Sequence, residues 1–82
     1  MKSFHLTVAK VGENLFDGEV ESVVAPGKDG IFQILAEHEP YVSELRPGTL
    51  RIRATDSETV TDIEVPEGGI AEVSRNEATI LL

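Results

Sequence analysis

Apolar and polar residues alternate along most of this 82-residue chain, and that alternation limits the folds it can adopt. Phe4, Leu6 and Val8 are separated by His5 and Thr7, and the same pattern returns in the middle and at the end of the chain. A period of two places successive side chains on opposite faces of a strand, whereas a helix needs apolar residues at every third or fourth position. No helical apolar stripe runs for more than two turns. The pattern therefore predicts an essentially all-β protein.

Short turn signals separate the alternating runs: Asp-Gly at 17–18, and further signals at 26–30, 46–48, 67–69 and 75–77. Short strands at such spacing are typical of antiparallel sandwiches and barrels. We predict one domain over residues 1–82, a two-layer antiparallel β-sandwich of eight to ten short strands. Leu50 and Ile52 should point inward, and Arg51 and Arg53 should point outward or flank an interface. The expected strands cover residues 4–9, 13–16, 19–25, 30–35, 41–45, 49–54, 58–65, 69–74 and 78–82.

The charge of the chain argues against several kinds of partner. Seven Lys and Arg stand against 15 Asp and Glu, for a formal net charge of -8. Nucleic acids and anionic lipids are both bound through basic residues. We therefore expect no nucleic-acid partner and no direct membrane binding, and an acidic surface suits a basic protein partner.

The absence of cysteine excludes a disulfide framework and a cysteine zinc site. The first ten residues lack an apolar run long enough for a signal peptide. No segment approaches the roughly 20 apolar residues of a membrane-spanning helix. These features predict a cytoplasmic protein.

The Glu-His-Glu stretch at 37–39 is the most conspicuous candidate for chemistry. A metal site needs several converging ligands, but the only other histidine is His5, and on an extended backbone Glu37 and Glu39 would point away from His38. Ser43 follows His38 by five positions without the Gly-x-Ser-x-Gly pattern of a nucleophile. The segment 26–30 lacks the spacing of a phosphate-binding loop. We expect no metal, no cofactor and no catalytic residue, and a chain this short can hardly form a deep cleft.

Three segments, in order, resemble one family over residues 4–82. The first has its matching positions at Phe16, Gly18, Val20, Val23, Gly27 and Gly30. The second has them at His38, Pro40, Tyr41, Val42, Leu45, Pro47, Gly48, Leu50 and Ile52. The third has them at Gly68, Gly69, Ile70, Glu72, Val73, Asn76, Thr79, Ile80 and Leu81. Together they resemble the N-terminal β-sandwich domain of the epsilon subunit of the bacterial F-type ATP synthase. The chain departs from that pattern at Gln33 and at Ala36-Glu37, where the family usually has glycine and Pro-Gly.

The resemblance implies a rotor function without catalysis. The family's sandwich sits at the foot of the central stalk, packs on the gamma subunit and on the polar loops of the c-ring, and couples proton transport to ATP synthesis. It implies a gamma-binding set, namely His38, Tyr41, Val42 and Ser43. It also implies a loop that faces the c-ring, made of Lys28, Asp29, Gly30 and Ile31. Membrane association would arise only through the complex, at the cytoplasmic face of the bacterial inner membrane.

The length of the chain bears on regulation. Family members usually continue into a C-terminal helical hairpin that can inhibit hydrolysis, whereas this sequence ends at Leu82. The resemblance therefore implies a short form without that hairpin. The alternative is a free-standing β-sandwich module that binds a protein or a carbohydrate. One Tyr and no Trp offer no aromatic platform, which counts against a carbohydrate ligand.

Overall fold

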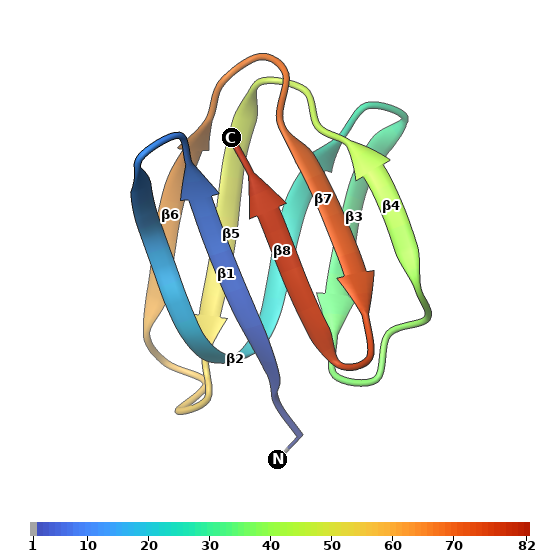
Figure 1. Ribbon diagram of the computed structural model, residues 1–82. Coiled ribbons are helices and arrows are strands. Elements are labelled where there is room, and N and C mark those ends of the chain that lie inside the picture. Colours follow the sequence, from blue (N-terminus) through green and yellow to red (C-terminus); the bar gives the residue numbers. More distant parts are fainter. Residues whose placement is uncertain (1) are drawn as a thin grey trace.

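The computed structural model describes residues 2–82, which form eight strands and no helix (Figure 1). The all-β prediction and the predicted number of strands are thus confirmed. The strands are β1 (Phe4–Lys10), β2 (Glu13–Gly27), β3 (Gly30–Leu35), β4 (Tyr41–Glu44), β5 (Gly48–Ala54), β6 (Val60–Val65), β7 (Ile70–Ser74) and β8 (Glu77–Leu81).

The strands form one continuous sheet that folds over into two layers (Figure 1). In the first layer β4, β7, β8 and β1 lie side by side, followed by the first half of β2. In the second layer the other half of β2 lies between β3 and β5, with β6 outermost. A register shift between Val20 and Ser22 interrupts the pairing of β2 with β5 where β2 passes from one layer to the other. Such irregularities bend a strand and increase its twist.

The predicted turn at Asp17-Gly18 is wrong. β2 runs without a break, so the expected strands 13–16 and 19–25 are one strand of 15 residues. Asp17 lies opposite Thr7 and Gly18 opposite Leu6 in the antiparallel ladder with β1. The backbone groups of this Asp-Gly pair are therefore satisfied by a neighbouring strand, and no chain reversal is needed.

The sheet is also not purely antiparallel, because β1 and β8 run parallel. The reason lies in the connection before β8. A two-residue hairpin reverses the chain between β7 and β8, and β8 then runs in the same direction as β1 beside it. The remaining pairs of named strands are antiparallel.

The core lies between the two layers and is mostly aliphatic. Phe4, Leu6 and Val8 of β1 are fully buried, as the alternation predicts. Leu50 and Ile52 of β5 point inward, again as predicted. The outward neighbour Arg51 is exposed and pairs with Asp62, and Arg53 is half-buried. Phe4 is the only aromatic residue among the buried core residues of the described chain, so Val, Ile, Leu and Ala do most of the packing.

The connections alternate between two ends of the sandwich, which Figure 1 shows at the bottom and the top. We call the end that lies near the N-terminus the amino end and the opposite end the carboxyl end. The amino end carries residues 2–3, the β3–β4 loop at 36–40, the β5–β6 loop at 55–59 and the β7–β8 turn at 75–76. The carboxyl end carries the β1–β2 turn, the β2–β3 turn at 28–29, the β4–β5 connection, the β6–β7 loop and residue 82. The two groups of residues that the resemblance singles out, the loop 28–31 and the stretch that begins at His38, thus start at opposite ends.

Candidate functional site

The β2–β3 hairpin forms a fixed projection at the carboxyl end. Lys28 and Asp29 are its exposed tip, and Gly30 takes a φ of 140°, which glycine adopts most readily. The backbone N–H of Lys28 donates to the carbonyl of Glu44 at 2.9 Å, and its Nζ lies 3.5 Å from Glu44 Oε2. Ile31, the second residue past the tip, is 71% exposed. The hairpin is therefore tied to β4 and presents an uncovered apolar side chain beside a charged tip.

A hollow of about 390 Å³ opens next to this hairpin. Two hydrogen bonds hold its loops together: Leu45 N–H donates to Gly69 O at 2.8 Å, and Arg46 N–H donates to Pro26 O at 2.9 Å. The lining contains neither a histidine nor a hydroxyl side chain, so it lacks the serine or threonine nucleophile and the histidine base of an acyl-transfer site. The lining residues are Lys28, Glu44, Leu45, Arg46, Pro47, Glu67, Gly68 and Gly69.

His38 lies in the β3–β4 loop at the amino end, where it is half-buried. Its Nδ1 is 2.6 Å from the carbonyl oxygen of Glu39, and its ring centroid is 5.9 Å from that of Tyr41. Tyr41 in turn meets Phe32 edge to face, with centroids 5.2 Å apart and an interplanar angle of 71°. His38 is thus part of a short aromatic row. Among residues 2–82, no group of three or more His, Asp or Glu is arranged to hold a metal ion.

The four predicted gamma contacts do not share one face. In the pairing of β4 with β7, Tyr41 and Ser43 lie opposite the buried residues Val73 and Ala71, and therefore point towards the interior. Val42 lies opposite the exposed Glu72 and points outward. The structure therefore brings His38 and Tyr41 together and places Val42 on the other side of β4, a strand at the sheet edge. A single partner can reach all of them only by wrapping around that edge.

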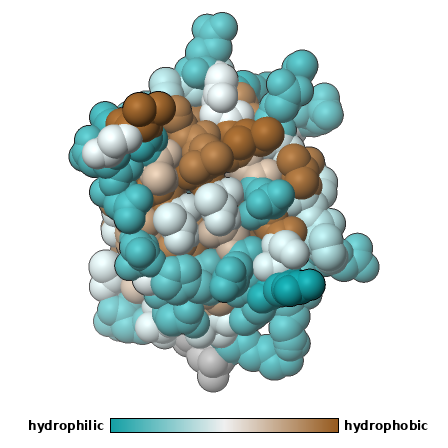
Figure 2. All heavy atoms as spheres, viewed as in Figure 1, coloured by the Kyte–Doolittle hydropathy of each residue, from teal (hydrophilic) through white to brown (hydrophobic). Residues whose placement is uncertain are grey.

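An apolar band crosses the outer surface of the first layer, and Figure 2 shows it as a hydrophobic strip across the upper part of this face. We define the apolar band as Val42, Ile70 and Leu81, which are 61%, 38% and 50% exposed. Ile70 lies directly opposite Leu81, and Leu81 pairs with Ala9 of β1 on its other side. Uncovered apolar side chains that gather on one face often mark a protein interface.

Sequence reasoning missed Ile70 and Leu81 as surface residues, although a signal for them exists. The alternation of polar and apolar residues breaks down where Ile70 precedes the buried Ala71 and where Leu81 follows the buried Ile80. In a strand with one face in water, apolar residues at consecutive positions place one of them on the outer face. The exposure of Ile70 and Leu81 could therefore have been inferred from these two breaks in the pattern, although their adjacency to Val42 could not.

A second missed feature is an ionic cluster around His5 on the same face, closer to the amino end. Its Nε2 is 2.5 Å from Asp17 Oδ1, and its Nδ1 is 3.4 Å from Glu19 Oε2. The hydrogen bond to Asp17 is the main cause that raises the pKa of His5 above its ordinary value, and Glu19 adds to the effect. These contacts link β1 to β2 on the protein surface.

The sequence of the chain matches one family model over residues 3–82. The family is the ATP synthase delta/epsilon chain, beta-sandwich domain. The chain is 43% identical over 81 residues to the ATP synthase epsilon chain of Chlorobium limicola, and this match covers 98% of the chain and 89% of that protein. It is 38% identical to the ATP synthase epsilon chain of Bradyrhizobium sp. (strain BTAi1), and there it covers 99% of the chain and 58% of the relative.

The fold is also found in a solved structure. A chain in the cryo-EM structure of the Euglena gracilis mitochondrial ATP synthase, OSCP/F1/c-ring, superposes with a TM-score of 0.88 at 23% identity. The match covers 96% of this chain and 49% of that one. Within residues 2–82 no helix is long and apolar enough to cross a membrane.

Proposed function

Because the chain belongs to the ATP synthase delta/epsilon family, we propose that it is the central-stalk subunit that links the gamma subunit to the c-ring. In this role it transmits rotation and so couples proton transport to ATP synthesis. It is a non-catalytic part of the enzyme. The family membership favours this function over a free-standing module that binds protein or carbohydrate.

The apolar band is the observation that carries the proposal. A protein that worked alone would leave Val42, Ile70 and Leu81 in water at no gain, whereas a subunit of an assembly buries them against a neighbour. We assign the band to the gamma subunit, with the contact continuing around the β4 edge to Tyr41 and His38. The predicted contact Ser43 is half-buried, and its hydroxyl donates to the carbonyl of Glu44 at 2.9 Å, so it contributes less than the others.

The c-ring is assigned to the β2–β3 hairpin at the carboxyl end, with Lys28, Asp29, Gly30 and Ile31 as its contact residues. The tie between Lys28 and Glu44 supports this assignment, because a fixed projection loses little conformational freedom when it binds. Lys28 and Arg46 lie with Glu44 and Glu67 around the hollow beside the hairpin, so this surface carries charges of both signs and suits the polar loops of the ring.

The subunit is peripheral to the membrane and attached through the complex. We place it at the cytoplasmic face of the bacterial inner membrane, since the relatives named above include epsilon chains of Chlorobium and Bradyrhizobium. The formal charge of -8 supports attachment through protein partners over direct attachment to anionic lipid.

The test is a binding titration between the purified chain and its gamma subunit. Val42→Asp should weaken binding more than tenfold, because it places a charge at the β4 end of the apolar band. Val60→Asp is the matched control: Val60 is 41% exposed and lies on the outer surface of the second layer. Both variants should retain the circular dichroism of the wild type. Absence of gamma binding by the wild type, or equal losses in the two variants, would contradict the proposal.

A further inference from the structure

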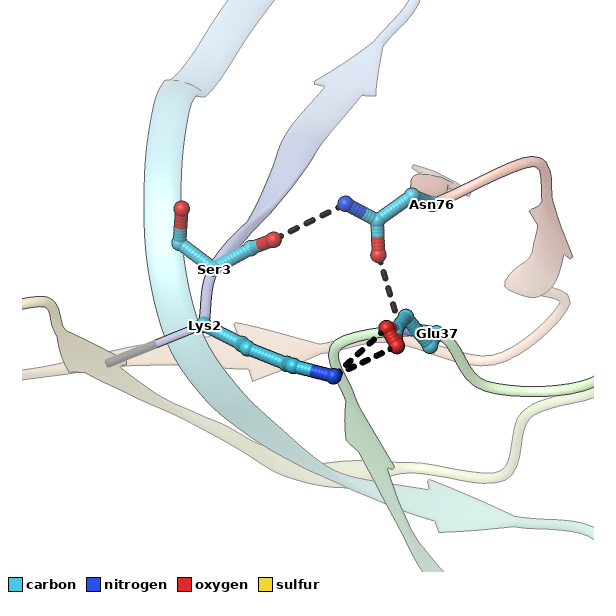
Figure 3. A network of polar contacts seen from close by, with 4 residues as sticks. All are labelled: Lys2, Ser3, Glu37 and Asn76. Carbon is cyan, nitrogen blue, oxygen red and sulfur yellow. Dashed lines mark hydrogen bonds and ion pairs between the residues drawn. The ribbon is translucent and has the colours of Figure 1, made fainter.

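Asn76 joins three segments that lie far apart in the sequence (Figure 3). Its side-chain Oδ1 accepts a hydrogen bond from the backbone N–H of Glu37 at 2.7 Å, and its Nδ2 donates to the carbonyl of Ser3 at 2.9 Å. Its own carbonyl accepts from the backbone N–H of His5 at 3.3 Å. One residue of the β7–β8 turn therefore connects the start of β1 with the β3–β4 loop.

The loop that Asn76 holds has an unusual backbone. Glu37 has a φ of 63°, which lies in the left-handed region that residues other than glycine rarely adopt. A conformation of this kind persists only where the surroundings stabilise it. The hydrogen bond from the Glu37 N–H to Asn76 and the one from the His38 N–H to the Leu35 carbonyl, at 3.2 Å, are the two backbone contacts that fix this turn.

The ion pair at the same place is a weaker restraint. Lys2 Nζ lies 2.8 and 2.9 Å from the two carboxylate oxygens of Glu37 (Figure 3), but the two side chains are 77% and 57% exposed. Pairs this open to water are screened and contribute little. The position of the loop backbone therefore depends mainly on Asn76.

The loop leads directly into the proposed partner surface. His38 follows Glu37, its ring rests against Tyr41, and Tyr41 rests against Phe32. A change in the backbone at Glu37 alters the direction in which His38 leaves the turn. We propose that Asn76 is a positioning residue for gamma binding, which holds the β3–β4 loop so that His38 and Tyr41 are presented at the edge of β4. This inference rests on the proposed function.

Few residues other than asparagine can do this. Asn76 has a φ of 60°, which asparagine tolerates better than most residues. Its amide offers a donor and an acceptor at once, and both are used here. Glycine would keep the turn and lose both side-chain bonds, while aspartate would keep an acceptor for Glu37 and lose the donor to Ser3. These two substitutions separate the turn from the contacts.

The experiment compares four variants of the whole chain. Asn76→Gly removes the contacts, and Asn76→Asp removes one of them. Arg75→Gly is a control in the same turn. The Arg75 side chain is exposed and makes no hydrogen bond or ion pair that the structure shows within residues 2–82. Lys2→Ala is a control that removes only the ion pair to Glu37. Each variant is measured by amide hydrogen exchange, followed by NMR, and by titration with the gamma subunit.

We expect Asn76→Gly to speed exchange of the Glu37 amide about tenfold and to weaken gamma binding about five- to tenfold, while the amides of β1 and β8 keep their protection. Asn76→Asp should keep most of the Glu37 protection, and the two controls should match the wild type in exchange of the Glu37 amide and in gamma binding. If Asn76→Gly lowers the overall stability as well, Asn76→Asp still tests the inference through its retained Glu37 protection.

Two results would overturn the inference. The first is an Asn76→Gly variant whose Glu37 amide exchanges as slowly as in the wild type. The second is an Asn76→Gly variant that binds gamma as tightly as the wild type does. A wild-type chain that fails to bind gamma would overturn the proposed function, and this inference with it, so the two failures are distinguishable.

Discussion

Tyr41 and Val42 are neighbours on β4 that face opposite sides, and their truncation to alanine should therefore have different consequences. Tyr41 is 42% exposed and packs against Phe32 and His38, so Tyr41→Ala removes an aromatic ring that is more than half covered. A large aromatic side chain buries about 150–250 Å². Taking about half of this area at about 25 cal/mol per Å², the lost burial amounts to about 2–3 kcal/mol, not counting the edge-to-face pair.

Val42→Ala should cost the fold much less, because Val42 is 61% exposed and lies directly opposite the exposed Glu72. The substitution removes two carbons that are mostly in water already, so we expect a loss of under about 1 kcal/mol of unfolding free energy. For gamma binding the two variants should resemble one another. Each removes part of the proposed interface, and each should weaken binding by about 1–3 kcal/mol.

The assay combines urea denaturation, followed by far-ultraviolet circular dichroism, with a gamma-binding titration at a temperature where both variants are folded. A chain of this length is expected to have a total stability of about 4–12 kcal/mol, so Tyr41→Ala should remain folded in water. The reasoning is refuted if Tyr41→Ala is no less stable than Val42→Ala. A gamma affinity that survives both substitutions would remove β4 from the interface.

Three further predictions concern the core, the ionic cluster and the β7–β8 turn. Ile52→Asp should lower the free energy of unfolding by several kcal/mol, because Ile52 is 1% exposed and the carboxylate would be buried without a partner; a loss below about 1 kcal/mol in urea denaturation would contradict this. The pKa of His5, measured by NMR titration, should lie above the ordinary value of 6.5, and Asp17→Asn should lower it. Because folding raises this pKa, the stabilisation from the contact is complete below pH 6.5 and is lost as the pH rises through the pKa of the folded state. A measured His5 pKa at or below 6.5 would contradict the prediction. Arg75 has a φ of 51°, and Arg75→Gly should raise stability by about 1 kcal/mol because glycine adopts the left-handed region without strain. Thermal denaturation should show a higher midpoint for the variant, and a lower midpoint would exclude strain at this position.

The sequence by itself determined the fold class, the inward positions and the family. Alternation is a property of adjacent residues, because successive side chains of a strand must point to opposite faces whatever the strand pairs with. For this reason Leu6, Leu50 and Ile52 could be assigned to the core without knowing the order of strands. The motifs around His38 and Gly69 identify the family in the same local way.

The surfaces were decided only by the tertiary structure. Asp17-Gly18 is extended because β1 lies beside it, although the same dipeptide in isolation favours a turn. The apolar band combines Val42, Ile70 and Leu81 because β7 lies between β4 and β8. Asn76 reaches residues 39 and 73 positions away in the chain. Contacts of this range depend on which strands become neighbours and in what register, and these are set by the packing of the whole sheet.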